Sequence, residues 1–382
     1  MFFEPAVKFI SALLSLLMMV FTAIPNIITE NMDARTENIQ QQLDRIAELT
    51  ELYASDDFVA VDESSLAGFD VEKAYEDGVK FNEVAYIATH NSYQLPSVPT
   101  IQKFFDNLEA LTFGGVSGEK PEFCSDTLTE QLNLGIRSVE LDIQTVVDGD
   151  EVSFVCSHSP LLDMTSTCYN FELALEEIRM WSDANPRHLP ITIIIEPKEF
   201  FLLEYGMRFF NLEYANVLDN LVSEVFGDKL ITPSEMMGEY DSFREMREAD
   251  DWMTLEECAG RVAVFFHDTD FVTEKYIAQD ETIKTRSMFP MLRYDDRDKS
   301  YASVLIVNKP DEIEKYSQEL VYDKNLIVRT MVDSYGSYNE DDRRKTLESG
   351  AQILSTDYPK KADMTGVEYY VDFGNGTARI IK

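Results

Sequence analysis

The chain has 382 residues, which exceeds one ordinary domain yet suits a single barrel-type α/β domain with one large core. Its 70 acidic and 33 basic residues give a formal net charge of −37, which argues against nucleic acid as a partner and against passive adhesion to anionic membranes. An anionic substrate would need local compensation from a cation or a small basic pocket.

Residues 9–24, FISALLSLLMMVFTAI, form an apolar run between Lys8 and Pro25. The run is longer than the core of most signal peptides and shorter than the roughly 20 residues of a spanning helix, so cleavage stays open. We predict that residues 1–28 are a signal peptide or membrane anchor and that the protein is secreted or held at the outer face of the cytoplasmic membrane. The alternative is a buried N-terminal helix of a cytosolic protein.

Residues 29–80 are polar and acidic, and we interpret them as a linker that contains one amphipathic helix. The apolar residues of that helix recur at helical spacing on one face: Ile39, Leu43, Ile46, Leu49 and Leu52. This helix is expected to form a stalk or a cap on the domain that follows, which we place at residues 81–382.

Beyond residue 82, apolar runs typical of strands alternate with helical patterns, which favours a parallel sheet covered by helices. Seven runs are expected to be strands: Val84–Ala88, Ile136–Ile143, Ile191–Glu196, Arg261–Phe266, Ser303–Val307, Leu326–Met331 and Gln352–Ser355. Together with Val152–Cys156 they approach the eight strands of a closed barrel. We therefore predict an α/β fold of the TIM-type (β/α)8 class, regular or distorted.

The stretch from Ile136 to His158 carries the most suggestive chemistry. Side chains alternate along a strand, so Glu140 and Asp142 share one face with Cα atoms about 6.6 Å apart. A turn at Asp148–Asp150 and a second extended run would bring His158 back toward them. This arrangement favours a metal-dependent phosphodiester site, and an acidic edge strand with an unrelated histidine is the alternative.

Polar residues also end two other predicted strands. His90 and Asn91 follow the first strand, and Glu196 ends the strand ITIIIE. Buried carboxylates require a cation or a network of basic partners, and few Arg or Lys residues lie nearby in the sequence. The hard oxygen donors favour calcium or magnesium over zinc.

Six motifs carry a family resemblance: THNSY (89–93), TLTEQLNLGIRSVELDI (127–143), SHSPLLDMTSTC (157–168), WSDANPRHLPITIIIEPK (181–198), LIVRT (326–330) and GAQILSTDYP (350–359). Together they resemble the bacterial calcium-dependent phosphoinositide-specific phospholipase C family over about residues 82–360. The resemblance implies a TIM-type barrel that cleaves the glycerol–phosphate bond of phosphatidylinositol. Diacylglycerol and an inositol phosphate, first in cyclic form, would be released.

The same resemblance implies the roles of individual residues. His158 would protonate the departing diacylglycerol oxygen, and His90 would stabilise charge or relay a proton near the inositol hydroxyl. Glu140 is a candidate base. The implied calcium ligands, with magnesium as second choice, are Asn91, Glu140, Asp142 and Glu196.

Other polar residues at strand ends are candidates for binding substrate. Lys198 could reach a phosphate oxygen or form a salt bridge with a ligand carboxylate. Arg329, Asp357 and Tyr358 could hold inositol hydroxyls or form a core ion pair under an aromatic cover. His188 and His267 are interpreted as structural, although His267 would lie at the barrel mouth.

Two features outside the catalytic motifs concern export of the protein and its contact with lipid. Cys156 and Cys168 flank the His158 loop, so they could form a disulfide in an exported protein. The segment 94–122 contains an apolar cluster that would be a lid, a lipid contact or packing on the rim.

The expected partner is a phosphoinositide lipid in a membrane surface, and the catalytic domain is expected to be monomeric. Two other functions stay open. One is a glycerophosphodiester phosphodiesterase, although Asn91 stands where that class has arginine after the histidine. The other is a non-catalytic, anchored calcium-binding or adhesion module.

Overall fold

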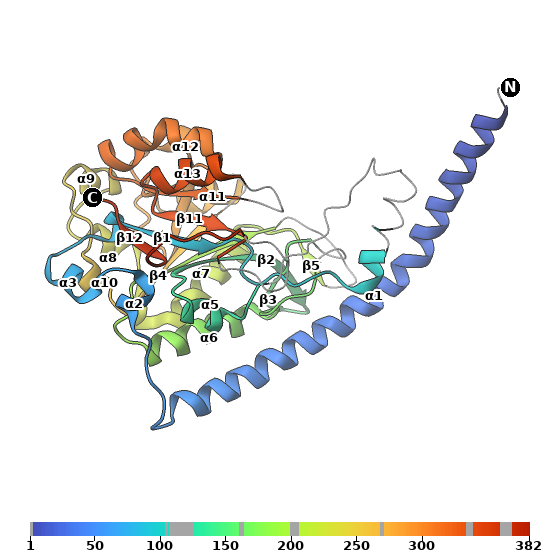
Figure 1. Cartoon of the computed structure of the whole chain (residues 1–382), viewed down its shortest axis with the longest axis horizontal. Coiled ribbons are helices and arrows are strands. Elements are labelled where there is room, and N and C mark those ends of the chain that lie inside the picture. The colour runs from blue at the N-terminus through green and yellow to red at the C-terminus, as the bar shows by residue number, and fades with distance from the viewer. Residues whose placement is uncertain are drawn as a thin grey trace.

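Eight parallel strands close into a barrel, which confirms the predicted TIM-type fold (Figure 1). The computed structural model describes residues 3–103, 106, 125–159, 164–198, 206–267, 271–333, 339–359 and 369–382. Most of the predicted lid, including its apolar cluster, lies outside these residues. Around the barrel the strands follow the order β1, β2, β4, β7, β8, β9, β10 and β11, and β1 pairs with both β2 and β11.

The strands of the described chain are β1 Val84–Thr89, β2 Ser138–Asp148, β3 Glu151–Cys156, β4 Ile191–Pro197, β5 Met207–Arg208, β6 Leu230–Ile231, β7 Val262–His267, β8 Phe289–Arg293, β9 Val304–Ile306, β10 Ile327–Met331, β11 Ile353–Thr356 and β12 Ala378–Ile380. The α-helices are α1 Phe3–Tyr53, α2 Glu63–Ala67, α3 Val71–Glu76, α5 Leu128–Asn133, α6 Phe171–Ala184, α7 Leu212–Phe226, α8 Pro233–Met237, α9 Phe243–Glu248, α10 Leu255–Cys258, α11 Phe271–Ala278, α12 Pro310–Ser317 and α13 Glu340–Glu348. A π-helical turn, Gln318–Asp323, continues α12.

The eighth barrel strand is not the one that the sequence indicated. Val152–Cys156 lies in β3, which pairs antiparallel with β2 in a hairpin outside the closed ring. The missing strand is β8, which pairs in parallel with β7 and β9. Its run FPMLR is short and contains Pro290, so it lacks the uninterrupted β-branched pattern that marks the other buried strands.

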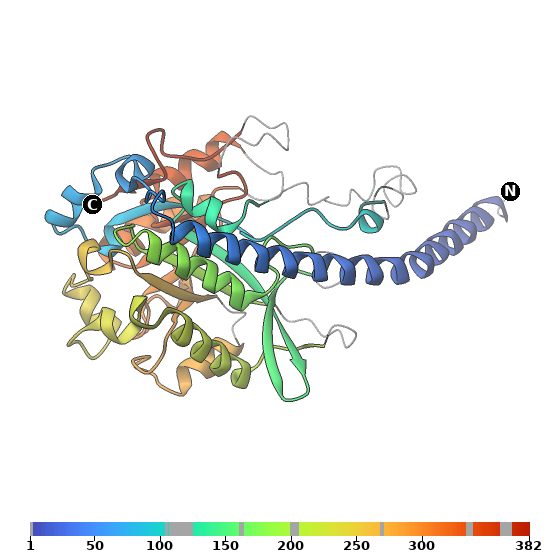
Figure 2. The ribbon, with the colours of Figure 1, turned by 90° about the horizontal axis from the view of Figure 1, so that it is seen from below.

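Helix α1 is far longer than the predicted amphipathic helix and lies along α6 (Figure 2). The predicted packing face is wrong in part, since Leu43 is 46% exposed and Leu52 is 49% exposed. The buried face carries a mostly polar set spaced by four and seven residues: Ile27, Asn31, Asn38, Gln42 and Leu49. Gln42 is accommodated on this face because the backbone of Asn170 offers it both a donor and an acceptor.

Within the described residues, no helix is both long and apolar enough to span a bilayer.

The range expected to be a linker holds α2 and α3 besides part of α1, and its second half packs against the barrel. Val71 and Tyr75 are buried with Val84 of β1 and Leu255 of α10. An ion pair reinforces this contact, because Glu63 receives hydrogen bonds of 2.8 and 2.5 Å from the buried guanidinium of Arg137. Residues 63–80 are therefore structurally part of the barrel base.

We predict that Glu63→Ala lowers the free energy of unfolding by about 3–5 kcal/mol, because it leaves the Arg137 guanidinium buried without its carboxylate. Ser65→Ala, on the exposed side of the same helix, should change it by no more than about 0.5 kcal/mol. Urea unfolding followed by circular dichroism measures both. Equal stability of Glu63→Ala and wild type would mean that this segment is a detachable linker.

Candidate active site

The register of the parallel strands brings the acidic residues to one end of the barrel. Asp142 of β2 is the direct neighbour of Glu196 of β4. Ile195 of β4 pairs with Phe266 of β7, so Glu196 and His267 are the next neighbours along these strands. Because all eight strands are parallel, their carboxyl ends form a single rim, which we call the barrel mouth.

Basic side chains compensate the buried carboxylates, contrary to the expectation from the sequence. Arg329 of β10 contacts Glu140 at 2.5 Å, and each side chain is only 2% exposed. The Lys198 ammonium lies 3.1 Å from Asp142 and 2.7 Å from Glu196. Nδ1 of His267 lies 3.0 Å from Glu196. Arg329 is 189 positions from Glu140 along the chain, so inspection of nearby sequence could not find it.

Burial and these charges shift the pKa values of the three carboxyl groups in different directions. Burial raises the pKa of Asp142 to about 7 even though Lys198 opposes the shift. Burial also acts on Glu140, but Arg329 and then His90 outweigh it and lower the pKa of that carboxyl. The pKa of Glu196 is likewise lowered, because its hydrogen bond and charge interaction with His267 overcome burial. Asp142 is therefore the carboxyl group with the least compensation.

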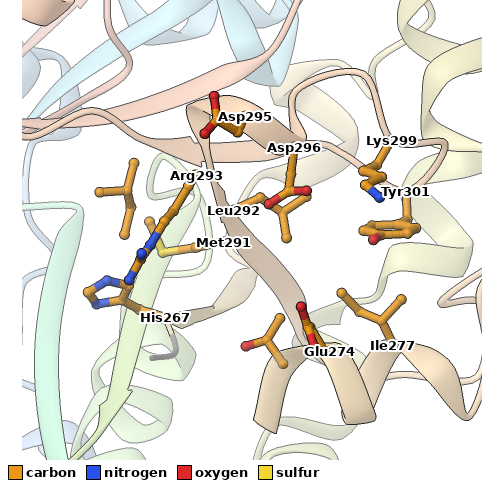
Figure 3. A pocket seen from close by; sticks show the side chains of 12 residues that line it. His267, Glu274, Ile277, Met291, Leu292, Arg293, Asp295, Asp296, Lys299 and Tyr301 are labelled. Atoms are coloured by element: carbon orange, nitrogen blue, oxygen red, sulfur yellow. The ribbon is translucent and has the colours of Figure 1, made fainter. Parts of the chain in front are cut away.

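A cavity of about 380 Å³ opens from the mouth beside His267, between the ends of β7, β8 and β9 (Figure 3). Its lining mixes both charges with an apolar floor. The charged residues are Glu274, Arg293, Asp295, Asp296 and Lys299, and Met291, Leu292, Ile277 and Ile306 are apolar. A polar group attached to a molecule in the mouth could enter this space.

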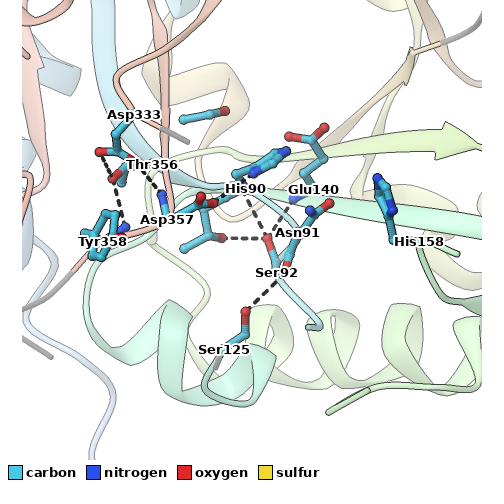
Figure 4. A network of polar contacts seen from close by, with 12 residues as sticks. His90, Asn91, Ser92, Ser125, Glu140, His158, Asp333, Thr356, Asp357 and Tyr358 are labelled. Carbon is cyan, nitrogen blue, oxygen red and sulfur yellow. Dashed lines mark hydrogen bonds and ion pairs between the residues drawn. The ribbon is translucent and has the colours of Figure 1, made fainter. Parts of the chain in front are cut away.

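The loop after β1 is attached directly to the acidic strand (Figure 4). Ser92 donates its backbone N–H to the carbonyl of Glu140 at 2.9 Å, and its hydroxyl accepts from the Glu140 N–H at 2.8 Å. Asn91 has φ 46°, in the left-handed region that asparagine tolerates better than most residues. This turn places Asn91 and His90 beside Glu140.

The donor set at the mouth suits a divalent cation. Oxygen atoms of Glu140 and Glu196 and a ring nitrogen of His267 lie within 4.8 Å of one another. Oδ1 of Asp142 is buried and accepts no hydrogen bond from the described residues. Carboxylates and the neighbouring Asn91 amide are hard ligands, which calcium and magnesium prefer. His267, interpreted as structural from the sequence, belongs to this group.

His90 is held by two aspartates in succession (Figure 4). Its Nδ1 lies 2.8 Å from Oδ1 of Asp357, while Asp333 accepts a hydrogen bond of 2.8 Å from the Asp357 N–H. Burial disfavours the charged imidazole, but the hydrogen bond to Asp357 and the charge of Glu140 outweigh it and raise the pKa of His90. The pair Asp357–Asp333 thus orients His90, and sequence analysis missed Asp333.

His158 lies at the rim, with 38% of its side chain exposed. The β2–β3 hairpin returns it as predicted, so that its Nε2 is 3.9 Å from Oδ2 of Asp142. Tyr93 donates a hydrogen bond of 3.0 Å to that same oxygen. Burial, then the nearby positive charge of Lys198, lowers the pKa of His158 to about 4. The substrate-free imidazole is therefore neutral near pH 7.

The hairpin also brings Cys156 and Cys168 close together. Cys156 and Cys168 are fully buried free thiols, and a hydrogen bond joins their side chains. The disulfide that an exported protein would allow is not formed, although the fold brings the two side chains together.

The four candidate substrate-binding residues divide into two groups. Lys198 and Arg329 form the salt bridges that were the alternative to a substrate contact. Asp357 orients His90, and Tyr358 packs edge-on against Tyr369 with ring centroids 5.4 Å apart. His188, by contrast, is structural as predicted: it lies between Ser182 and the Leu189 carbonyl, and burial lowers its pKa to about 3.

Comparisons with known proteins agree with this architecture. A family model described as "Phosphoinositide phospholipase C, Ca2+-dependent" matches residues 150–381, more than half of the chain. No curated protein sequence matches.

Two of the similar solved structures are of a calcium-dependent phosphoinositol-specific phospholipase C from Pseudomonas sp. The apo crystal form 1 has TM-score 0.57 at 16% identity over 84% of this chain and 100% of that chain, and the myoinositol complex has 0.54 at 15% over 84% and 99%. A Streptomyces antibioticus phosphatidylinositol-specific phospholipase C has TM-score 0.49 at 17% identity over 73% and 95%. The Pseudomonas likeness supports the barrel fold.

We predict that Lys198→Met destabilises the metal-free protein by about 3–5 kcal/mol, because two buried carboxylates lose their shared cation. Added calcium should then raise the melting temperature of the variant more than that of wild type, since it replaces the lost charge. Lys309→Met removes an exposed ion pair with Glu312 and serves as the control. An equal calcium response in wild type and Lys198→Met would reject a cation site beside Lys198.

Proposed function

Because this chain belongs to the calcium-dependent phosphoinositide phospholipase C family, a class of phosphoric diester hydrolases, we propose that it cleaves the glycerol–phosphate bond of phosphatidylinositol. The products would be diacylglycerol and an inositol phosphate that is first cyclic. The observation that supports this most is the meeting of His90, His158 and the carboxylates of β2 and β4 at one barrel mouth. Two histidines beside a cation site suit phosphodiester cleavage by an internal hydroxyl.

Calcium is the proposed cofactor. The chain would hold it through Asn91, Glu140, Asp142 and Glu196, with His267 close enough to contribute or to orient Glu196. When bound, the ion would supply positive charge to the phosphoryl oxygens and lower the pKa of the attacking inositol hydroxyl. Arg329 occupies Oε2 of Glu140, so the role of metal ligand or base falls to Oε1.

The histidines are proposed to divide the proton transfers. His158 is exposed to an incoming lipid, and an anionic phosphodiester beside it would raise its pKa and favour a proton on the ring. That proton would pass to the departing diacylglycerol oxygen. His90 is buried, is oriented by Asp357, and carries positive charge more readily, so it would stabilise the phosphoryl oxygens.

The charges that line the cavity beside His267 indicate which inositol headgroup is preferred. It offers two cations, Arg293 and Lys299, against three carboxylates, and the whole chain has a net charge of −37. An additional phosphate on the inositol ring would therefore meet little net attraction. We propose that unphosphorylated phosphatidylinositol in a membrane surface is preferred, and that a monomeric catalytic domain acts on it from outside the cytoplasmic membrane.

We predict that excess chelator abolishes turnover of phosphatidylinositol and that calcium restores it, because Asp142 and Glu196 need a cation beyond Lys198. Asn91→Ala should raise the calcium concentration required for half-maximal activity. Release of diacylglycerol from labelled phosphatidylinositol measures both. Undiminished turnover in chelator would contradict the metal assignment. Turnover of glycerophosphoinositol instead of the lipid would favour a glycerophosphodiesterase, and turnover of neither would favour a silent binding module.

We also predict that the two histidines respond differently to the leaving group. His158→Ala should lose about 10²–10⁴-fold in kcat/KM on phosphatidylinositol, whose leaving group is an alkoxide, and far less on a nitrophenyl analogue that needs no proton. His90→Ala should impair both substrates alike. If His158→Ala impaired both equally, its acid role would be wrong. If only His90→Ala were rescued by the nitrophenyl group, the two roles would have to be exchanged.

A further inference from the structure

Contacts along α6 give the direction in which α1 crosses the barrel. Gln42 meets Asn170, which caps the start of α6, whereas the N–H of Val61 donates to Asn185, which caps its end. Asn170 forms a β-bridge with Val155 of β3, and Val155 pairs with Gln144 of β2. Gln144 lies two residues beyond Asp142, so Asn170 and the start of α6 are at the mouth end of the barrel. Helix α1 therefore runs from the mouth toward the base, and its N-terminal half extends past the mouth.

Directional polar contacts fix the position of α1. The Gln42 side chain exchanges two hydrogen bonds with the backbone of Asn170, at 3.0 and 2.7 Å. Arg45 donates at 2.9 Å to Glu177, whose side chain is only 1% exposed, and also to the Thr167 carbonyl. An apolar seam would tolerate sliding or rotation, but these bonds form in one register only. The helix is thus attached rigidly to the barrel.

A second attachment lies nearer the N-terminus. Ile27 is buried with Val98 and Ile101, and Glu30 accepts hydrogen bonds from both the N–H and the hydroxyl of Thr100. This partner segment continues the β1 loop that carries His90 and Asn91. The loop that forms the site thus reaches α1 well above Gln42, so the site and the projecting helix lie on the same side of the domain (Figures 1 and 2).

The apolar run 9–24 lies beyond both attachments. At 1.5 Å per residue, Ile24 is about 27 Å from Gln42 along the helix axis, and the run itself is about 24 Å long. The strand-end side of the barrel also carries Phe209, 57% exposed, next to β5, which pairs with β2 past Asp142. An exposed aromatic side chain therefore lies on the side that the mouth faces.

We propose that α1 is a rigid strut: residues 9–24 insert into a lipid bilayer, and the contacts of residues 23–45 with the barrel turn the mouth toward that bilayer. The proposal rests on the proposed function. A chain of net charge −37 is repelled by a surface of anionic phosphoinositide, so unassisted adsorption would be weak and unoriented. A tether supplies proximity, and a rigid tether also supplies orientation.

The test compares two insertions of seven residues between Thr22 and Ala23 of the full chain. One is built from helix formers and keeps the helix continuous, while the other is built from Gly and Ser and makes the joint flexible. Gln42→Ala loosens the lower attachment, and Gln41→Ala, on the exposed face, is its matched control. Each protein is assayed on vesicles of phosphatidylcholine with phosphatidylinositol and on monomeric dihexanoyl phosphatidylinositol.

All proteins are expected to sediment equally with vesicles and to cleave the monomeric substrate equally. On vesicles, turnover per bound enzyme should fall about tenfold for the flexible insertion and measurably for Gln42→Ala, and remain near wild type for the helical insertion and Gln41→Ala. Equal turnover on vesicles by both insertion variants would overturn the proposal of a rigid strut and leave the proposed function unaffected. So would failure of wild type to sediment with vesicles, or a mass spectrum lacking residues 9–24. Absence of cleavage of the monomeric substrate by wild type would instead overturn the proposed function.

Discussion

The site depends on placing three carboxylates, two of them buried, together at one end of the barrel. Glu140 and Asp142 are 2% and 0% exposed, and charges so placed are stable only beside opposite charge. Arg329 of β10 and His267 of β7 supply part of it from other strands, and Lys198 supplies part from the end of β4. The remainder, concentrated on Asp142, is what a bound cation would supply, so the same constraint accounts for stability and for function.

The surrounding structure keeps these groups from relaxing apart. One main-chain hydrogen bond and one through the Ser92 hydroxyl join the β1 loop to Glu140, and the Asp333 carboxylate accepts from the backbone N–H of Asp357 behind His90. Each functional side chain is thus positioned by backbone that belongs to the barrel itself. His158 differs, because the hairpin delivers it to the rim, where it is partly exposed and open to substrate.

The sequence predicted the parts of the fold that follow local patterns. Apolar strand runs separated by helical periodicity indicated the barrel, and seven of its eight strands were located. The exception, Phe289–Arg293, has a length and composition that do not distinguish a strand from a loop, and only pairing with β7 and β9 makes it one. On α1, the apolar residues did not mark the whole packing face, because Gln42 buries its polar side chain against the backbone of Asn170, which is distant in sequence.

By itself the sequence determined which polar residues lie on or directly after the apolar strands, because alternation and strand length are local, and it thereby indicated His90, Glu140, Asp142 and Glu196. The family motifs added Arg329 and Asp357 without indicating their partners. Only the tertiary structure decided that Arg329 neutralises Glu140, that Asp357 orients His90 and that His267 joins the carboxylates. The physical reason is that these contacts form across the closed ring, whose strand order brings together residues up to 267 positions apart along the chain.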